Sequence, residues 1–105
     1  MSYLEIKVGE SSDSLNHQIV INQEAQSDLT NYVCEYIILD DKNVIVQTPV
    51  DVPAVNGVFP VRLTPDKTSG LQVGYYRVCV QITNPVLEFN QESIIPLQVF
   101  PQYFV

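Results

Sequence analysis

His17 is the only histidine in the chain and the first side chain to consider for acid-base chemistry. An imidazole titrates near neutral pH and could serve as a general base. Here it stands in a polar stretch between Asn16 and Gln18, and no Ser/His/Asp or Cys/His arrangement can be assembled around it. We therefore interpret His17 as an ordinary surface residue, and the sequence predicts no catalytic residue and no enzyme.

A group of oxygen ligands occurs at Asp40, Asp41 and Asn43, and Asp51 or Asp66 could join it. Carboxylate and amide oxygens are the ligands that Ca²⁺ prefers in proteins. The spacing lacks the regular D-x-D-x-D-G pattern of a calcium loop, so a polar hairpin turn is the favoured interpretation. The sequence also contains no CxxC, HExxH, GxGxxG or Walker motif, so it predicts neither a metal site nor a cofactor.

The two cysteines, Cys34 and Cys79, could form a disulfide or remain free thiols. Each lies in a predicted strand, in which successive side chains point to opposite faces. In this register Cys34 points to the core with Tyr36, whereas Cys79 points away from it with Arg77. One thiol inside and one outside favours two free cysteines over a bridge.

Aromatic side chains are the remaining candidates for function. The chain has six tyrosines and four phenylalanines, and several occupy positions where burial is not expected. Exposed aromatic side chains that lie close together are typical of protein-protein contacts, because they bury a large area at low entropic cost. We therefore predict an interface made of Tyr75, Arg77, Phe89, Tyr103, Phe104 and Val105. The alternative is that the tail, residues 101–105, folds back onto its own sheet.

The composition limits the classes of protein to which the chain can belong. With 105 residues it is expected to form a single domain, 1–105. The net charge is −7 and the five Lys and Arg residues are scattered singly, so binding to nucleic acid is not expected. No apolar run approaches the roughly 18 residues of a membrane span. The N-terminal segment MSYLEIKVGESS lacks the regions of a secretion signal, so we expect a protein that is used without secretion.

The central stretch of the sequence, residues 58–83, predicts a strand, a helical turn and a second strand. Two sets of side chains alternate in each arm with the period of two that a half-buried strand requires. Between the arms, Thr64 can cap a short helical turn near 65–70 with its hydroxyl on a backbone N–H, and Pro65 suits the first helical position. The Asn56-Gly57 pair just before this stretch predicts a type I′ turn.

The rest of the sequence predicts further short strands at 3–8, 18–22, 31–39, 44–47 and 93–100. The segment 31–39 is the longest apolar candidate and is expected to be central in a sheet. About seven short, mostly antiparallel strands indicate an all-β fold of immunoglobulin-like β-sandwich type, with a small Greek-key barrel as the alternative.

Prolines and polar segments predict the connections between these strands. Pro49 and Pro53 indicate that 48–55 is an edge strand or a crossing connection, because proline cannot donate to a central ladder. Pro96 predicts a bulge or an unpaired edge position in 93–100. A helical turn could form at 24–27. The segment that follows Asn84-Pro85 predicts a loop that exposes Leu87 and Phe89.

A family resemblance is carried by the run LTPDKTSGLQVGYYRVCVQI, which is followed by a polar loop and SIIPLQVFPQY. It resembles a small immunoglobulin-like module encoded among the structural genes of tailed bacteriophages, and it is similar to the N-terminal domain of phage baseplate upper proteins. The matching positions are Leu63, Thr64, Pro65, Thr68, Leu71, Gly74, Tyr76, Leu97, Val99 and Pro101, with Asp28, Leu29 and Thr30 in the N-terminal part. The sequence departs from the family at Cys79 and in the segment PVLEFNQ.

The resemblance implies a non-enzymatic structural protein of the virion, assembled in the host cytoplasm and present in many copies. It would bind other virion structural proteins as a tail, baseplate or neck accessory or as a capsid decoration (cement) module. The tail residues Tyr103, Phe104 and Val105 would then dock on a neighbouring subunit. A carbohydrate- or receptor-binding module is the alternative, with Tyr75, Arg77 and Phe89 as a stacking platform.

Overall fold

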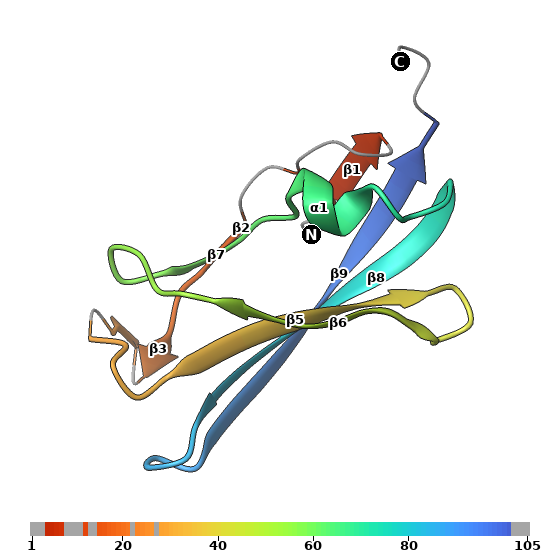
Figure 1. Cartoon of the computed structure of the whole chain (residues 1–105). Coiled ribbons are helices and arrows are strands. Elements are labelled where there is room, and N and C mark those ends of the chain that lie inside the picture. Colours follow the sequence, from red (N-terminus) through yellow and green to blue (C-terminus); the bar gives the residue numbers. More distant parts are fainter. Residues whose placement is uncertain (1–3, 8–11, 13–14, 22, 27, 102–105) are drawn as a thin grey trace.

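The computed structural model describes residues 4–7, 12, 15–21, 23–26 and 28–101, in which nine strands and one short helix are arranged in three sheets. In chain order the elements are β1 (Leu4–Lys7), β2 (Leu15–His17), β3 (Val20–Ile21), β4 (Glu24–Ala25), β5 (Val33–Asp40), β6 (Ile45–Val52), β7 (Phe59–Val61), α1 (Pro65–Thr68), β8 (Gly74–Asn84) and β9 (Phe89–Phe100) (Figure 1). The prediction of an all-β fold is confirmed. There are more strands than expected, and two of them are long rather than short.

The main sheet has five strands in the order β1-β9-β8-β5-β6. Strands β8 and β9 are 11 and 12 residues long and form a hairpin at its centre. All neighbours are antiparallel except β1, which pairs with β9 in parallel, Leu4 opposite Leu97. Strand β5 lies inside the sheet, as predicted for 31–39, and β6 forms an edge, as one of the two predictions for 48–55 requires.

A second, smaller layer covers one face of the main sheet. It contains the pair β2-β7, the short hairpin β3-β4 and α1, which lie on the same side of the long strands in Figure 1. The segment before β2 is tied to this layer, because Ser12 N donates to Leu63 O at 2.9 Å and Leu63 N donates to Ser12 Oγ at 2.8 Å. The two layers therefore enclose one apolar interior.

The core follows from the alternation of side chains along the long strands. Every second residue of β5, β8 and β9 is turned toward the second layer, and those in the middle of β5 and β8 and in the second half of β9 are buried. The members of this inner face include Cys34, Tyr36, Ile38, Val78, Val80, Ile82, Ile95, Leu97 and Val99, and the second layer contributes Phe59, Val61 and Leu63. Cys34 is buried, Cys79 is half-exposed and both are free, which confirms the predicted register of both cysteines.

The connections around α1 agree with the predicted backbone but not with the predicted cap. Asn56 and Gly57 have φ angles of 51° and 78°, and Val55 bridges to Val58, as in the predicted type I′ turn. Thr64 occupies the N-cap of α1 with Pro65 inside its first turn. The Thr64 hydroxyl makes no capping bond to a backbone N–H, however, because it donates to the Asp66 carboxylate instead.

The N-terminal third departs most from the sequence prediction. Of the strand predicted at 18–22, Val20 and Ile21 are the described residues that form a strand, the two-residue β3, whereas β2 ends before this segment at His17. The helical turn predicted at 24–27 is wrong, because Glu24 and Ala25 form β4 and pair with β3. Gln23 has a φ angle of 67°, so the chain reverses there in a tight hairpin instead of winding into a helix.

The turn between β8 and β9 is shorter than predicted, which changes the position of Phe89. The Asn84 side-chain oxygen accepts hydrogen bonds from the backbone N–H groups of Val86 and Leu87 at 3.0 and 3.3 Å. The turn therefore closes before Phe89, which begins β9 opposite Asn84. Leu87 is exposed as predicted, whereas the prediction that Phe89 lies in an exposed loop is wrong.

Pro96 lies within β9 and causes no bulge. The pairing of β8 with β9 runs without a register shift past Arg77 and Pro96. Pairing on the other edge of β9 begins one residue later, at Leu97 opposite Leu4. The predicted bulge is therefore wrong, and Pro96 is not at an edge, because β9 lies between β1 and β8.

Candidate interaction surface

The side of the main sheet that faces away from the core is not covered by any described element. We call this side the outer face. It is formed by the alternate residues of the long strands, among them Glu35, Ile37, Leu39, Tyr75, Arg77, Cys79, Gln81, Glu92, Ile94 and Pro96. Tyr75 is 68% exposed and Ile94 is 63% exposed, although both lie within strands. An open sheet face with large apolar side chains is the feature of this fold best suited to bind a partner.

An apolar row crosses the middle of the outer face. Ile37 of β5, Cys79 of β8 and Ile94 of β9 are opposite one another in the strand register. Ile45 and Pro49 of β6 continue the apolar surface, and together these side chains line a groove of about 430 Å³. A groove of this size can accept a few side chains of another molecule.

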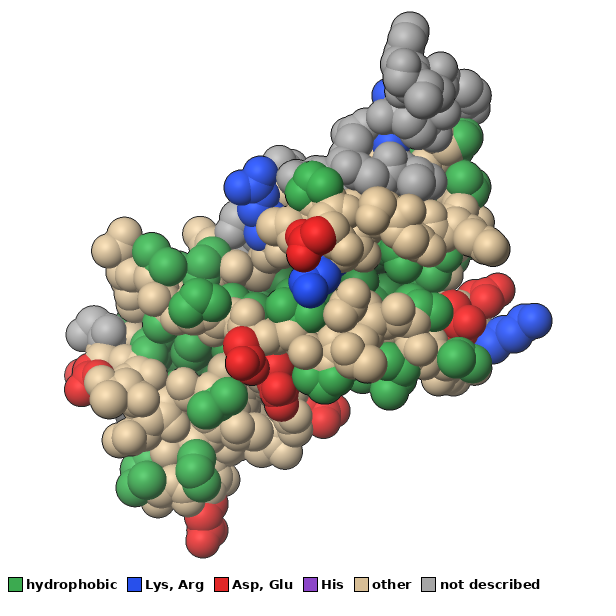
Figure 2. Space-filling model, in the orientation of Figure 1, with side chains coloured by type: hydrophobic (Ala, Val, Ile, Leu, Met, Phe, Trp, Pro, Cys, Tyr) green, Lys and Arg blue, Asp and Glu red, His purple; other side chains and the backbone are tan. Residues whose placement is uncertain are grey.

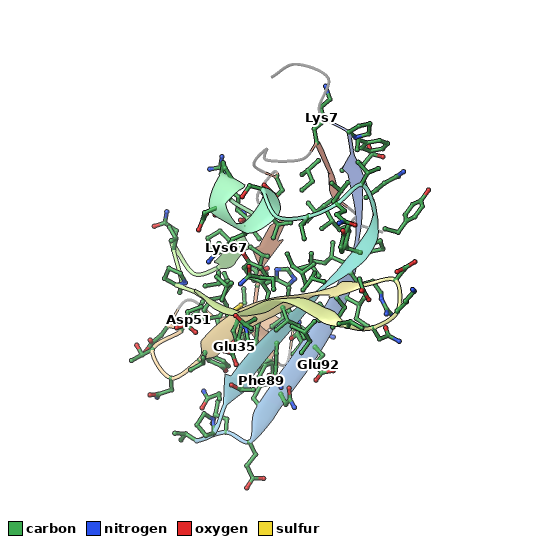
Figure 3. The ribbon with its side chains drawn as sticks, turned by 45° about the vertical axis from the view of Figure 1, so that its right-hand side comes forward. Lys7, Glu35, Asp51, Lys67, Phe89 and Glu92 are labelled. Atoms are coloured by element: carbon green, nitrogen blue, oxygen red, sulfur yellow. The ribbon has the colours of Figure 1, made fainter. Side chains whose placement is uncertain are left out.

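An acidic row lies beside the apolar row. Asp51, Glu35, Gln81 and Glu92 are opposite one another on β6, β5, β8 and β9. Asp51, Glu35 and Glu92 succeed one another across the sheet in Figure 3, and Figure 2 shows acidic side chains gathered below the centre of the molecule beside hydrophobic ones. Among the described residues the one ion pair is Lys67 with Asp66, at 3.6 Å, so the carboxylates of this row have no salt-bridge partner there.

The thiols are not activated for nucleophilic chemistry. Burial raises the pKa of Cys34 to about 11, with a smaller contribution from the charge of Glu35. Partial burial also raises the pKa of Cys79, and Glu92 raises it further while Arg77 opposes this effect. Both groups are therefore protonated at neutral pH, and Cys79 contributes to the groove as a small apolar side chain.

The structure separates the six predicted interface residues. Tyr75 and Arg77 lie on the outer face of β8, and the Tyr75 hydroxyl accepts a hydrogen bond from Gln98 Nε2 at 3.3 Å. Phe89 points to the inner face, where its ring meets Tyr32 edge-to-face at a centroid distance of 5.5 Å. It lies at the far end of the hairpin from Tyr75, roughly 30 Å along the strand, so the predicted stacking platform does not form. Tyr103, Phe104 and Val105 lie outside the described residues.

The other residues considered for chemistry lie apart from the outer face or in turns. His17 is half-buried in β2, opposite Phe59. The Asp40 carboxylate accepts hydrogen bonds from the backbone N–H groups of Lys42 and Val44, each at 2.9 Å, which confirms the hairpin-turn interpretation. Within the described ranges, no three His, Cys, Asp or Glu side chains are grouped as metal ligands. No helix in that part of the chain is long and apolar enough to cross a membrane.

Several residues of the outer face were missed by the sequence analysis. In the sequence Ile37 and Ile94 fit the pattern of apolar strands, and Glu35 and Glu92 are too far apart in the chain to form a recognisable group. The segment 31–39 does carry a signal of this surface. Its apolar side chains occupy both odd-numbered and even-numbered positions, whereas a strand with one face in water should alternate apolar and polar residues. That excess of apolar residues on the face opposite Cys34 indicates a second surface that favours contact.

Comparison of the sequence with known protein families and with curated proteins gives no match. The fold and the surface themselves define the chain as a small all-β protein with one open, partly apolar sheet face that is bordered by carboxylates.

Proposed function

We propose that this chain is a non-enzymatic structural protein of a tailed phage virion, and that it binds other virion proteins through the outer face. The observation that carries the proposal is the exposure of Ile94 in the groove at Cys79, together with the exposure of Tyr75 further along the same face of β8. Large apolar side chains exposed on one face of a small protein mark an interaction surface, because their contact with a partner removes them from water.

The resemblance to immunoglobulin-like phage modules belongs to this proposal. Six of the thirteen positions that carry it are buried in the core: Leu29, Leu63, Thr68, Leu71, Leu97 and Val99. Tyr76, another of these positions, donates its hydroxyl to Gln72 O at 2.8 Å and so holds the segment between α1 and β8. The shared pattern is therefore one that builds a core and a strand connection.

The immunoglobulin-like sandwich is the finer form of the fold that we propose. Two β layers with a shared apolar interior and mostly antiparallel pairing support it. The long hairpin β8-β9 gives the unit a stiff axis, so that it can serve as a spacer between larger components. A tail, baseplate or neck accessory and a capsid decoration module are the proposed places in the particle.

Composition analysis of purified particles tests this function. The encoding phage should yield particles that contain the protein in a fixed copy number, measured by quantitative mass spectrometry, and its gene should be flanked by portal, capsid or tail genes. A particle that lacks the protein would refute the proposal.

Two matched variants connect the particle result with the outer face. Ile94→Asn changes the centre of the outer face and should reduce the copy number, because a polar side chain then occupies the apolar row. Val86→Asn changes an equally exposed apolar side chain in the β8-β9 turn and should leave the copy number unaltered. Equal occupancy of both variants would exclude the outer face as the contact.

A carbohydrate- or receptor-binding module is the other class of function. The stacking platform predicted for it does not include Phe89, because that ring points to the inner face. Tyr75 and Arg77 remain on the outer face. Binding of the isolated protein to a glycan array, lost in Tyr75→Ser, would favour this class over the structural one.

A further inference from the structure

We infer that the partner of the outer face is a basic, amphipathic polypeptide segment, in which apolar side chains stand beside Lys or Arg. The inference rests on the proposed function, since it names the chemistry of the partner at that same surface. Three features of the outer face lead to it: the apolar row, the acidic row and the spacing between them.

The apolar row indicates that the partner contributes apolar side chains. Ile37, Cys79 and Ile94 present hydrocarbon and a protonated thiol side by side across three strands, and Ile94 is 63% exposed. Contact with apolar side chains is favourable there, at about 25 cal/mol for each Å² removed from water. A purely polar partner would not obtain this favourable free energy.

The acidic row indicates that the partner also contributes basic side chains. Asp51 and Glu35 are directly opposite each other on neighbouring strands, an arrangement of like charges that destabilises a sheet. Glu92 follows two strands further on, about 10 Å from Glu35 at a strand spacing near 4.8 Å. The basic residue of β8 on the same face, Arg77, lies on the opposite side of the apolar row. Cationic side chains of a partner would compensate this unbalanced charge.

The spacing of the two rows fits a polypeptide. They lie two residues apart along each strand, or about 7 Å. Residues i and i+2 of an extended segment lie on one side at the same spacing, and residues i and i+4 of a helix lie about 5–6 Å apart. Lys and Arg also cover apolar surface with their stems while the charged group remains at the rim.

A second copy of this chain is the less suitable occupant. Its net charge is −7, and its outer face carries the same row of carboxylates. Contact between two outer faces would bring like charges together in an interface, which opposes association. The complementary partner is therefore a different, basic polypeptide.

Titration of the full ¹⁵N-labelled chain with a short synthetic peptide of the repeat Val-Ser-Lys-Ser tests the inference by NMR, because its Val and Lys residues are two positions apart and share one side when the peptide is extended. The largest chemical-shift changes should fall on the amides of Ile37, Cys79, Ile94 and their neighbours on the same strands. Binding should weaken with added NaCl because the charges are near the surface. A peptide with Glu in place of every Lys should not bind.

Two double variants distinguish an effect of the acidic row on binding from an effect of the net charge of the protein. Glu35→Gln with Glu92→Gln should weaken binding of the Val/Lys peptide roughly fivefold, as expected for the loss of two exposed charge pairs. Glu24→Gln with Glu88→Gln removes the same charge from exposed positions in β4 and the β8-β9 turn, and it should leave binding unaltered. An equal effect of the two double variants, shifts located elsewhere, or equal binding of the Glu peptide would overturn the inference.

The outcome is distinguishable from failure of the proposed function. Incorporation of the protein into particles without any binding of the Val/Lys peptide would refute the basic partner and leave the structural function in place. Binding of the peptide as described by a protein that is absent from particles would refute the virion function and support the chemistry inferred for the surface.

Discussion

Glu35 and Asp51 lie directly opposite each other on β5 and β6, with both carboxylates in one row of the outer face. Replacing one of them with a neutral residue should stabilise the sheet, because like charges in cross-strand pairs repel each other. We expect Asp51→Asn to raise the free energy of unfolding by about 0.2–1 kcal/mol, with the larger effect at low salt. Urea denaturation at low and high NaCl measures this.

Asp41→Asn is the control for that substitution. Asp41 is exposed in the β5-β6 turn and is not paired across strands with another carboxylate, so its loss should alter stability less. If Asp51→Asn lowers stability, the repulsion between the two carboxylates is not the dominant effect at this site. A stabilising Asp51→Asn that also weakens partner binding would show that the row is kept for contact at the expense of stability.

The edge-to-face contact between Tyr32 and Phe89 should contribute to stability, because both rings are partly buried against the core. We expect Phe89→Ala to lower the free energy of unfolding by about 1–3 kcal/mol, less than for a fully buried phenylalanine. Leu87→Ala, at an exposed position of the adjacent turn, should change it by less than about 0.5 kcal/mol. Similar values for the two substitutions in urea unfolding would contradict the inward position of Phe89.

Two glycines should respond in opposite directions to the same substitution. Gly57 has a φ angle of 78° in the type I′ turn, so Gly57→Ala should destabilise the protein by about 1 kcal/mol. A Cβ added at Gly70 would meet nothing within 4 Å, and the residue does not require a positive φ angle. Gly70→Ala should therefore be neutral or stabilising by up to about 1 kcal/mol. Thermal unfolding of both variants checks the pair, and a stable Gly57→Ala would exclude the predicted turn geometry.

The two thiols should differ in their reaction with a thiol reagent. Cys79 is half-exposed on the outer face, whereas Cys34 is 2% exposed in the core. At mildly alkaline pH we expect one equivalent of thiol to react in the native protein and the second only after denaturant is added. Mass spectrometry of the labelled peptides should assign the first label to Cys79. Early labelling of Cys34 would contradict the register of β5.

Stability should fall at alkaline pH because of Cys34. Burial raises its pKa from 9.0 to about 11, so the folded chain retains this proton at a pH where the unfolded chain has lost it. The stabilisation is complete below pH 9 and is lost as the pH rises toward 11, by at most about 1.4 kcal/mol for each pH unit.

The variant Cys34→Ala isolates this effect. The pKa values of Tyr36 and Cys79 are also raised by burial, and these groups titrate in both proteins. The difference in unfolding free energy between wild type and Cys34→Ala should therefore decrease between pH 9 and pH 11. A difference that stays constant over this range would mean that Cys34 is not buried as a thiol.

The inner and outer faces of the long strands could be predicted from the sequence because one face of each is buried. Alternation along 75–83 placed Val78, Val80 and Ile82 inside and Cys79 outside, and the structure agrees. The short strands β2, β3 and β4 could not be predicted in the same way. They contain two or three residues each, which is too short for periodicity to appear, and their pairing is decided by tertiary contacts and by the reversal at Gln23.

The acidic row was beyond the reach of the sequence for a related reason. Glu35 and Glu92 are far apart in the chain, and they share a row only through the register of β5 and β9 against β8. That register depends on the lengths of the intervening turns. The position of Phe89 shows the effect, because closure of one turn by the side chain of Asn84 placed it in a strand and on the inner face.

The parallel pairing of β1 with β9 has a consequence for biosynthesis. Leu4 and Ile6 lie opposite Leu97 and Val99, almost the whole length of the sequence away. Strand β1 is synthesised well before β9 and has no place in the sheet until β9 exists, and such distant contacts form slowly. Until β1 of the same chain pairs there, the outer edge of β9 near Leu97 is open to β1 of another molecule, so exchange of β1 between chains is the misfolding route to expect at high expression.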